Sequence, residues 1–113
     1  LIYNVFYISG VLSQSDKIII PDLFRLFQNY PNPFNPTTTL KYFIGQDADV
    51  KVTIHDLLGN VIRDLFRGKE SSGYKLIQWD GMNDNGRLVP GGVYLYTIEA
   101  GKESKTKKMI LLK

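Results

Sequence analysis

The sequence contains no cysteine. This absence excludes a thiol nucleophile, a disulfide framework and every zinc or iron–sulfur site that is built on cysteine ligands. It leaves the cellular compartment open, because proteins without disulfides occur on both sides of a membrane. The sequence also lacks any apolar run close to the roughly 18 residues of a membrane-spanning helix. Asn4 and the early Tyr and Phe residues make the N-terminus a poor signal peptide.

Residues that carry catalysis or bind metals are equally scarce. His55 is the only histidine, and its alternation with Val52 and Ile54 places it on the outer face of a strand. No nucleophile elbow, phosphate-binding glycine loop or HExxH motif occurs. Asp80 and Asp84 lie in a turn-rich segment, where Asp is favoured for hydrogen bonding to the backbone. The sequence therefore predicts no enzyme activity, no cofactor and no catalytic metal.

The charge is concentrated at one end of the chain. The 113 residues, enough for one domain, carry a net charge of +3. Residues 102–113 contain five Lys and one Glu, which is 5 − 1 = +4, so the preceding residues sum to −1. Nucleic-acid-binding proteins usually spread basic side chains along a face with aromatic side chains between them. We therefore expect no nucleic-acid partner, and the first residue, Leu1, suggests a piece of a longer protein.

Apolar and polar residues alternate along most of the chain, which is the pattern of half-buried β-strands. Short strands separated by turn residues predict an all-β domain, an immunoglobulin-like antiparallel β-sandwich of about seven strands. In the last strand we expect Ile110 and Leu112 to be buried, while Lys107, Lys108 and Lys113 are exposed. The predicted strands are residues 40–44, 50–54, 61–66, 74–79, 93–100 and 106–112, with one more from the first 25 residues.

The boundaries and turns follow from breaks in this pattern. Residues 1–25 are predicted to be a linker or the end of a preceding domain, and residues 26–113 to form the sandwich. Gly59-Asn60 suits a primed hairpin turn between Leu58 and Val61. Pro90-Gly91 suits a type II turn, and Asp80-Gly81 and Asn85-Gly86 suit turns with a positive φ.

A calcium loop is incomplete in this turn-rich segment. The pattern requires an acidic ligand five residues before Gly86 and a Glu six residues after it. Those positions hold Gly81 and Gly92. We therefore predict turns here and no calcium site.

Three prolines follow one another closely in the run Tyr30-Pro31-Asn32-Pro33-Phe34-Asn35-Pro36. Proline has no N–H to donate to a β-ladder, so this run must lie outside the central strands. One interpretation is a rigid connector whose Tyr30 and Phe34 close the end of the core. The other is a recognition segment, because Pro33 and Pro36 form a PxxP pattern, which is weak evidence by itself.

Five blocks of the sequence resemble one family. In order they are LFQNYPNPFNPTTT from Leu26, IHDLLG from Ile54, WDG from Trp79, VPGGVYLY from Val89 and the terminal KMILLK. This order is similar to the type A C-terminal sorting domain of type IX secretion substrates. It resembles more loosely the immunoglobulin-like domain of flagellar hook-capping proteins. The family motifs map onto Pro31, Pro33, Phe34 and Pro36, onto Gly92 and Tyr94, and onto Lys107, Lys108 and Lys113.

The resemblance implies a role in protein transport. Such a domain follows a cargo domain in the same chain and is recognised, after export to the periplasm, by the type IX channel of the outer membrane and its shuttle protein. The cargo is then secreted or displayed on the cell surface, and the resemblance allows a sortase-like peptidase to remove the domain and anchor the cargo. The alternative is a structural or carbohydrate-binding accessory module of an extracellular enzyme, which uses surface Tyr and Trp.

Overall fold

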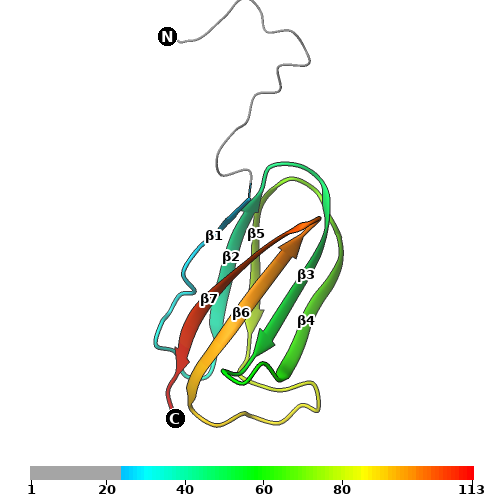
Figure 1. The fold of residues 1–113 in the computed structure, drawn as a ribbon. Coiled ribbons are helices and arrows are strands. Elements are labelled where there is room, and N and C mark those ends of the chain that lie inside the picture. Colours follow the sequence, from blue (N-terminus) through cyan, green and yellow to red (C-terminus); the bar gives the residue numbers. More distant parts are fainter. Residues whose placement is uncertain (1–23) are drawn as a thin grey trace, which may run out of the picture.

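The structure is a computed structural model that describes residues 24–113. These residues form seven strands and no helix, as Figure 1 shows. Residues 24–113 contain no helix that is long and apolar enough to span a membrane. The strands are β1 (Phe24–Leu26), β2 (Thr38–Ile44), β3 (Ala48–His55), β4 (Val61–Glu70), β5 (Gly73–Trp79), β6 (Gly92–Ala100) and β7 (Glu103–Leu111).

The strands form two antiparallel sheets that face each other. One sheet has the order β1-β2-β5 and the other the order β4-β3-β6-β7. The predicted all-β, immunoglobulin-like sandwich of seven strands is therefore confirmed. β1 and β7 are edge strands of different sheets, and they lie side by side along one open side of the sandwich.

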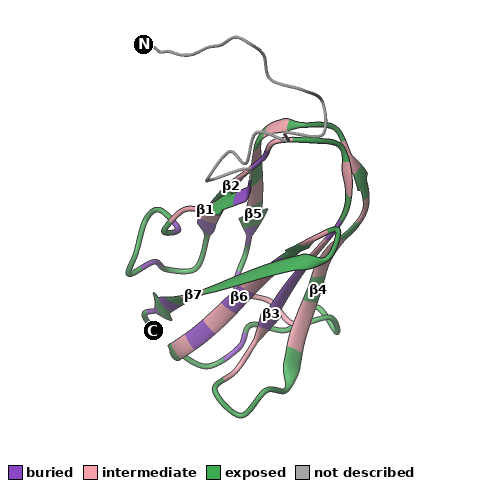
Figure 2. Cartoon of the chain, turned by 45° about the horizontal axis from the view of Figure 1, so that its top comes forward, coloured by how far each residue is buried: buried purple, intermediate pink, exposed green. Residues whose placement is uncertain are grey.

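The core lies between the two sheets and follows the predicted alternation. Leu40, Tyr42 and Ile44 of β2 are buried. In the other sheet, the alternating apolar residues of β3 and β6 are buried as well. In Figure 2 buried residues are purple, and along the strands they alternate with pink and green residues that are partly or fully exposed. The predicted inward direction of Trp79 is confirmed by a fully buried side chain. A single apolar cluster thus connects both sheets.

The last strand has the opposite face buried from the one predicted. Met109 and Leu111 are buried, whereas Ile110 and Leu112 are 37% and 50% exposed. The register explains the difference, because Met109 pairs with Tyr94 of β6, whose side chain faces the core. Directly opposed residues in a β-ladder share a face, and a shift of one residue exchanges the two faces.

The turn between β3 and β4 also differs from the prediction. It is a five-residue loop, Asp56–Asn60, in which the N–H of Asp56 donates to the carbonyl of Asn60 and the N–H of Gly59 donates to that of Asp56. Gly59 has a φ of 91°. The Asp56 carboxylate accepts hydrogen bonds from the backbone N–H groups of Leu58 and Asn60. A further bond from the Asn60 side chain is the main cause that lowers the pKa of Asp56.

The glycine predictions in the long β5–β6 connection have mixed outcomes. Gly81 and Gly86 have positive φ values of 78° and 77°, as predicted for the two turns. The type II turn at Pro90-Gly91 is wrong, because Gly91 does not have the positive φ that this turn requires at its third position.

Most of the predicted linker, residues 1–23, lies outside the described residues. Phe24 and Arg25, which the sequence analysis grouped with it, belong to β1 and pair with Ile44 and Phe43 of β2. Phe24 is 5% exposed and belongs to the core.

Candidate functional site

The proline run connects β1 to β2 across one end of the sandwich. Pro31, Pro33 and Pro36 are exposed, and Phe34 is buried in the core. Phe34 thus closes the end of the core as predicted, but Tyr30 does not, because it is 81% exposed. Tyr30 pairs with Thr39, a residue between the buried Thr38 and Leu40, and this register turns the Tyr30 side chain outward.

The same segment binds the outer edge of β7. The N–H of Phe34 donates to the carbonyl of Ile110 at 3.0 Å, and the N–H of Leu112 donates to the carbonyl of Phe34 at 2.8 Å. The Oδ1 atom of Asn32 accepts a bond from the N–H of Ile110 at 3.0 Å. The side chain of Gln28 donates to the carbonyl of Lys108 at 2.8 Å. The C-terminal half of β7 is therefore held on both of its edges, by β6 and by residues 28–34.

A buried polar network fixes the entry to the proline run. The Asn29 side chain, 2% exposed, donates to the Thr38 hydroxyl at 3.0 Å and to the Pro31 carbonyl at 3.1 Å. The Tyr96 hydroxyl accepts a bond from the N–H of Asn29 at 2.9 Å and donates to the carbonyl of Phe27 at 2.7 Å. Burial of the ring raises the pKa of Tyr96 to about 12. The backbone of the run is thereby tied to both sheets.

Aromatic side chains join the blocks that are distant in the sequence. The Trp79 ring lies 5.8 Å from the Phe34 ring and 5.6 Å from the Tyr94 ring, measured between centroids. The Trp79 indole N–H donates to the carbonyl of Met82, and the Tyr94 hydroxyl donates to the carbonyl of Pro90. Desolvation by burial raises the pKa of Tyr94. The three rings therefore pack together, tilted by 59° and 71° to one another, at the contact of the proline run with β5 and β6.

Two glycines permit close backbone contacts at the same end. A Cβ atom on Gly91 would lie 3.1 Å from the carbonyl oxygen of Leu111 and 3.1 Å from the Cβ of Lys113. A Cβ atom on Gly81 would lie 2.9 Å from the carbonyl oxygen of Pro36, a distance that real Cβ atoms do not tolerate. A side chain at Gly91 would thus crowd the end of β7, so the small size of glycine permits the close approach seen here.

We call this arrangement the C-terminal clamp: residues 28–34, Trp79 and residues 90–94, placed around residues 108–113. The clamp contains most of the predicted site residues. Phe34 and Tyr94 are buried in it, and Gly92 pairs with Leu111. Lys108 and Lys113 are exposed on it. Pro31 and Pro33 lie in its exposed loop, and the exposed Pro36 follows just outside it.

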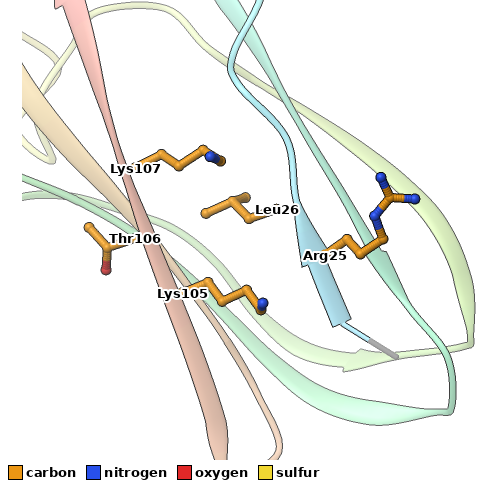
Figure 3. A pocket seen from close by; sticks show the side chains of 5 residues that line it. All are labelled: Arg25, Leu26, Lys105, Thr106 and Lys107. Atoms are coloured by element: carbon orange, nitrogen blue, oxygen red, sulfur yellow. The ribbon is translucent and has the colours of Figure 1, made fainter. Parts of the chain in front are cut away.

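Lys107 lies beside the clamp and differs from the prediction. It is half-buried rather than exposed, and its side chain extends from β7 toward β1, as Figure 3 shows. The odd-numbered residues of β7 point to the inner side of their sheet, where Met109 and Leu111 are buried. Lys107 shares this direction, at the point where the edges of the two sheets meet.

Three polar residues of the clamp, Gln28, Asn29 and Asn32, were not predicted from the sequence. Their role depends on partners that are far away in the sequence, since Gln28 and Asn32 bind residues 80 and 78 positions later. The available signal was the alternation of Asn with Pro in the run, because Asn side chains readily replace backbone partners.

The isolated polar residues that were weighed as catalytic have structural partners. The Nε2 atom of the half-buried His55 lies 2.9 Å from the Thr97 hydroxyl. Asp80 accepts a bond from the N–H of Met82, and Asp84 accepts one from the N–H of Asp64. Among residues 24–113, no group of three or more acidic or His side chains is placed to hold a metal ion.

Comparison with known proteins places the fold in a family. The model of the FlgD Ig-like domain matches residues 35–104, more than half of the chain. The chain belongs to this family. The looser of the two sequence resemblances is thereby confirmed. A search of curated proteins finds no match.

Solved structures give two further likenesses. The first is to dimeric latent PorU of Porphyromonas gingivalis, with a TM-score of 0.63, 26% identity and coverage of 83% of this chain and 10% of PorU. The second is to PorZ of the same bacterium, with a TM-score of 0.53, 23% identity and coverage of 78% of this chain and 11% of PorZ. PorZ is described as an essential bacterial surface component of the type-IX secretion system. The chain therefore spans about a tenth of the length of either protein.

Proposed function

We propose that this family member is a C-terminal sorting domain, which directs a cargo domain of the same polypeptide through the type IX secretion system. The observation that carries the proposal is the convergence of the sequence blocks. Blocks that begin at Leu26, Trp79 and Val89 meet the terminal block at a single place, the C-terminal clamp. The clamp holds the end of β7 in a fixed position with Lys108 and Lys113 exposed.

In this proposal the domain is the passenger of the machinery and has no catalytic activity of its own. Its partners are the outer-membrane channel, the shuttle protein and, where the cargo is anchored, a sortase-like peptidase. The destination is the cell surface or the medium, reached through the periplasm and the outer membrane. The shared fold with PorZ supports the proposal at the level of the fold.

The test fuses a fluorescent reporter, preceded by a periplasmic export signal, to the N-terminus of residues 1–113 in a bacterium with a type IX system. The triple change Lys107→Ala, Lys108→Ala and Lys113→Ala should reduce secretion by roughly tenfold, the effect of about 1.4 kcal/mol of lost recognition. The reporter is measured in the medium, at the surface and in the periplasm. Equal secretion of the parent and this variant would show that the three lysines are not recognised by the secretion machinery.

A matched control separates recognition from charge and stability. The control uses three other lysines, Lys51, Lys69 and Lys102. One of them is half-buried and two are exposed, as for the three lysines of the test. Their triple change to Ala removes the same charge, and loss of the surface pair of Lys69 with Asp49 costs little. This control should be secreted like the parent, whereas retention of the parent fusion in the periplasm would contradict the proposed function itself.

The alternative, a carbohydrate-binding module, keeps part of its support. Trp79 is fully buried and cannot bind a sugar, but Tyr74 is 60% exposed on the outer face of the β1-β2-β5 sheet. It contacts the ring of Phe43, and the Lys41 ammonium lies 4.9 Å from its centroid. Tyr74→Ala should leave secretion unchanged, and loss of binding to a glycan array in that variant would favour the alternative.

A further inference from the structure

The outer edge of β7 is covered over only part of its length. The backbone N–H and C=O groups that point away from β6 belong to the even-numbered residues. The hydrogen bonds of Ile110 and Leu112 to the proline run show this direction. By the same alternation, the N–H and C=O of Ser104 and Thr106 and the N–H of Lys108 also point away from β6. No residue of the described part of the chain forms a hydrogen bond to these five groups.

A groove runs beside this uncovered edge. It is lined by Arg25 and Leu26 of β1 and by Lys105, Thr106 and Lys107 of β7. In Figure 3 the Leu26, Lys105 and Lys107 side chains extend into the space between the two strands, while Arg25 and Thr106 point away from it. The Lys105 ammonium lies 5.7 Å from the centroid of the Phe24 ring. Within residues 24–113 the edge is therefore open to a groove and is bordered by two ammonium groups.

No ion pair among the described residues neutralises the positive charge of this edge. β7 contains Lys105, Lys107 and Lys108 and a single acid, Glu103, at its first position. The five ion pairs of residues 24–113 all lie elsewhere, on β3, β4, β5 and the β5–β6 connection. An unpaired strand edge is a template for another strand, and its charge determines which strand it accepts.

We propose that the edge Ser104–Lys108 binds an extended, acidic segment of a partner protein, which adds to β7 as a further strand. Backbone hydrogen bonds to Ser104, Thr106 and Lys108 supply the attachment, and carboxylates supply the specificity. Neighbouring strands place side chains of the same face opposite one another, so acids at alternate positions face Lys105 and Lys107. This binding does not depend on a role in secretion, and the two proposals are tested by different measurements.

The binding test uses the 113-residue chain and a peptide of about seven residues, a common strand length, in which Glu and Thr alternate. The peptide is acetylated and amidated, and a peptide with Lys in place of Glu serves as its charge control. Binding is followed by NMR, together with the exchange rate of each backbone amide. We expect the Glu peptide to slow the exchange of the Thr106 and Lys108 amides by about tenfold or more, since each gains a hydrogen bond.

Two variants of one residue isolate the strand addition. Thr106→Pro removes the outward N–H, and proline is tolerated on an edge strand whose N–H faces solvent. Thr106→Ala keeps the N–H, and both variants lose the contact of the Thr106 hydroxyl with Thr97. The Pro variant should bind the Glu peptide about tenfold more weakly than the Ala variant, the effect of about 1.4 kcal/mol from a lost bond.

A charge reversal tests the specificity and does not touch the backbone. The double change Lys105→Glu and Lys107→Glu should exchange the preference, so that the Lys peptide binds more tightly than the Glu peptide. The Glu peptide should also bind the parent more weakly as the salt concentration rises toward about 1 M, where charges are screened within about 3 Å.

Several results would overturn the proposal. The first is an absence of binding at millimolar peptide, and the second is binding that leaves the Thr106 and Lys108 amides unprotected, which would indicate charge attraction alone. Equal affinity of the Pro and Ala variants would exclude strand addition. Slow exchange of the two amides before any peptide is added would show that another part of the chain, or a second copy, already covers the edge.

Discussion

At the scale of single residues, two buried polar side chains, Asn29 and Thr38, help to hold the domain together because they are paired. Asn29 and Thr38 are almost completely buried, and each forms hydrogen bonds to the proline run or to each other. Burial of a polar group without a partner costs free energy, so such groups fix the positions of their partners. The Tyr96 hydroxyl extends this network, because it accepts a bond from the N–H of Asn29 and donates one to the carbonyl of Phe27.

Tyr96→Phe tests this network. The change leaves the carbonyl of Phe27 and the N–H of Asn29 without their partner while the ring volume stays nearly the same. The free energy of unfolding should fall by about 1–3 kcal/mol, the usual effect of an unsatisfied buried group. Urea denaturation gives the value, and an unchanged midpoint would show that water replaces the hydroxyl.

Two tyrosines predict a loss of stability in alkaline solution. Desolvation by burial raises the pKa of Tyr42 and of Tyr96 to about 12, with a smaller effect of the Glu70 carboxylate on Tyr42. Their pKa in the unfolded chain is about 10. The unfolded state therefore releases protons from about pH 10 that the folded state retains until about pH 12, so the stability falls across this range.

The measurement is the free energy of unfolding at about pH 9 and about pH 11, with an expected loss of about 1 kcal/mol for each tyrosine at the higher pH. The double variant Tyr42→Phe and Tyr96→Phe starts from a lower stability and should show a smaller decrease. An equal decrease in the parent and the double variant would assign the alkaline effect to other groups.

At the scale of the elements, the sequence predicts a strand well where apolar and polar residues alternate. β2, β3 and β6 have such patterns, and their buried faces agree with the prediction. Four consecutive apolar residues, Met109–Leu112, stand at the end of β7 and just after it, so the pattern is the same for both faces. The face is decided by pairing with Tyr94 of β6, a contact that local sequence does not contain.

The corrected face of β7 gives a matched pair of variants. Leu111 is 4% exposed and Leu112 is 50% exposed, although they are neighbours of the same residue type. Leu111→Ala should reduce the free energy of unfolding by about 2–5 kcal/mol, as in other cores. Leu112→Ala should change it much less, by about 0.5 kcal/mol. Thermal or urea denaturation distinguishes the two variants. A larger effect at Leu112 would support the buried face that was predicted from the sequence.

The clamp could be predicted from the sequence only in part. The sequence resemblance assigned Phe34, Tyr94 and the lysines to motifs without placing them together, and the core position of Phe34 agrees with one of the two interpretations of the proline run. The attachment of the proline run to β7 was not predicted, because it joins residues about 80 positions apart through backbone groups. Such bonds have no signature in residue type, since every residue except proline has the same donor and acceptor.

At the scale of the whole molecule, the two sheets share a single core, and the clamp is one place where they are joined. Trp79 of the β1-β2-β5 sheet contacts Tyr94 of the other sheet and Phe34 of the connecting run. The hydrophobic cluster contains residues of both sheets without a gap. A domain of this size with one core usually unfolds in a single cooperative step.

We therefore predict that the clamp and the sheets unfold together. Trp79 is fully buried, so its fluorescence reports the clamp, while far-ultraviolet circular dichroism reports all strands. The two urea transitions should coincide in the parent. Leu40→Ala in one sheet and Ile98→Ala in the other should each move both transitions to a lower concentration by the same amount, at a cost of about 2–5 kcal/mol. A fluorescence transition that precedes the loss of strands would show that the clamp opens by itself, and the exposed end of β7 would then be presented by a partly unfolded domain.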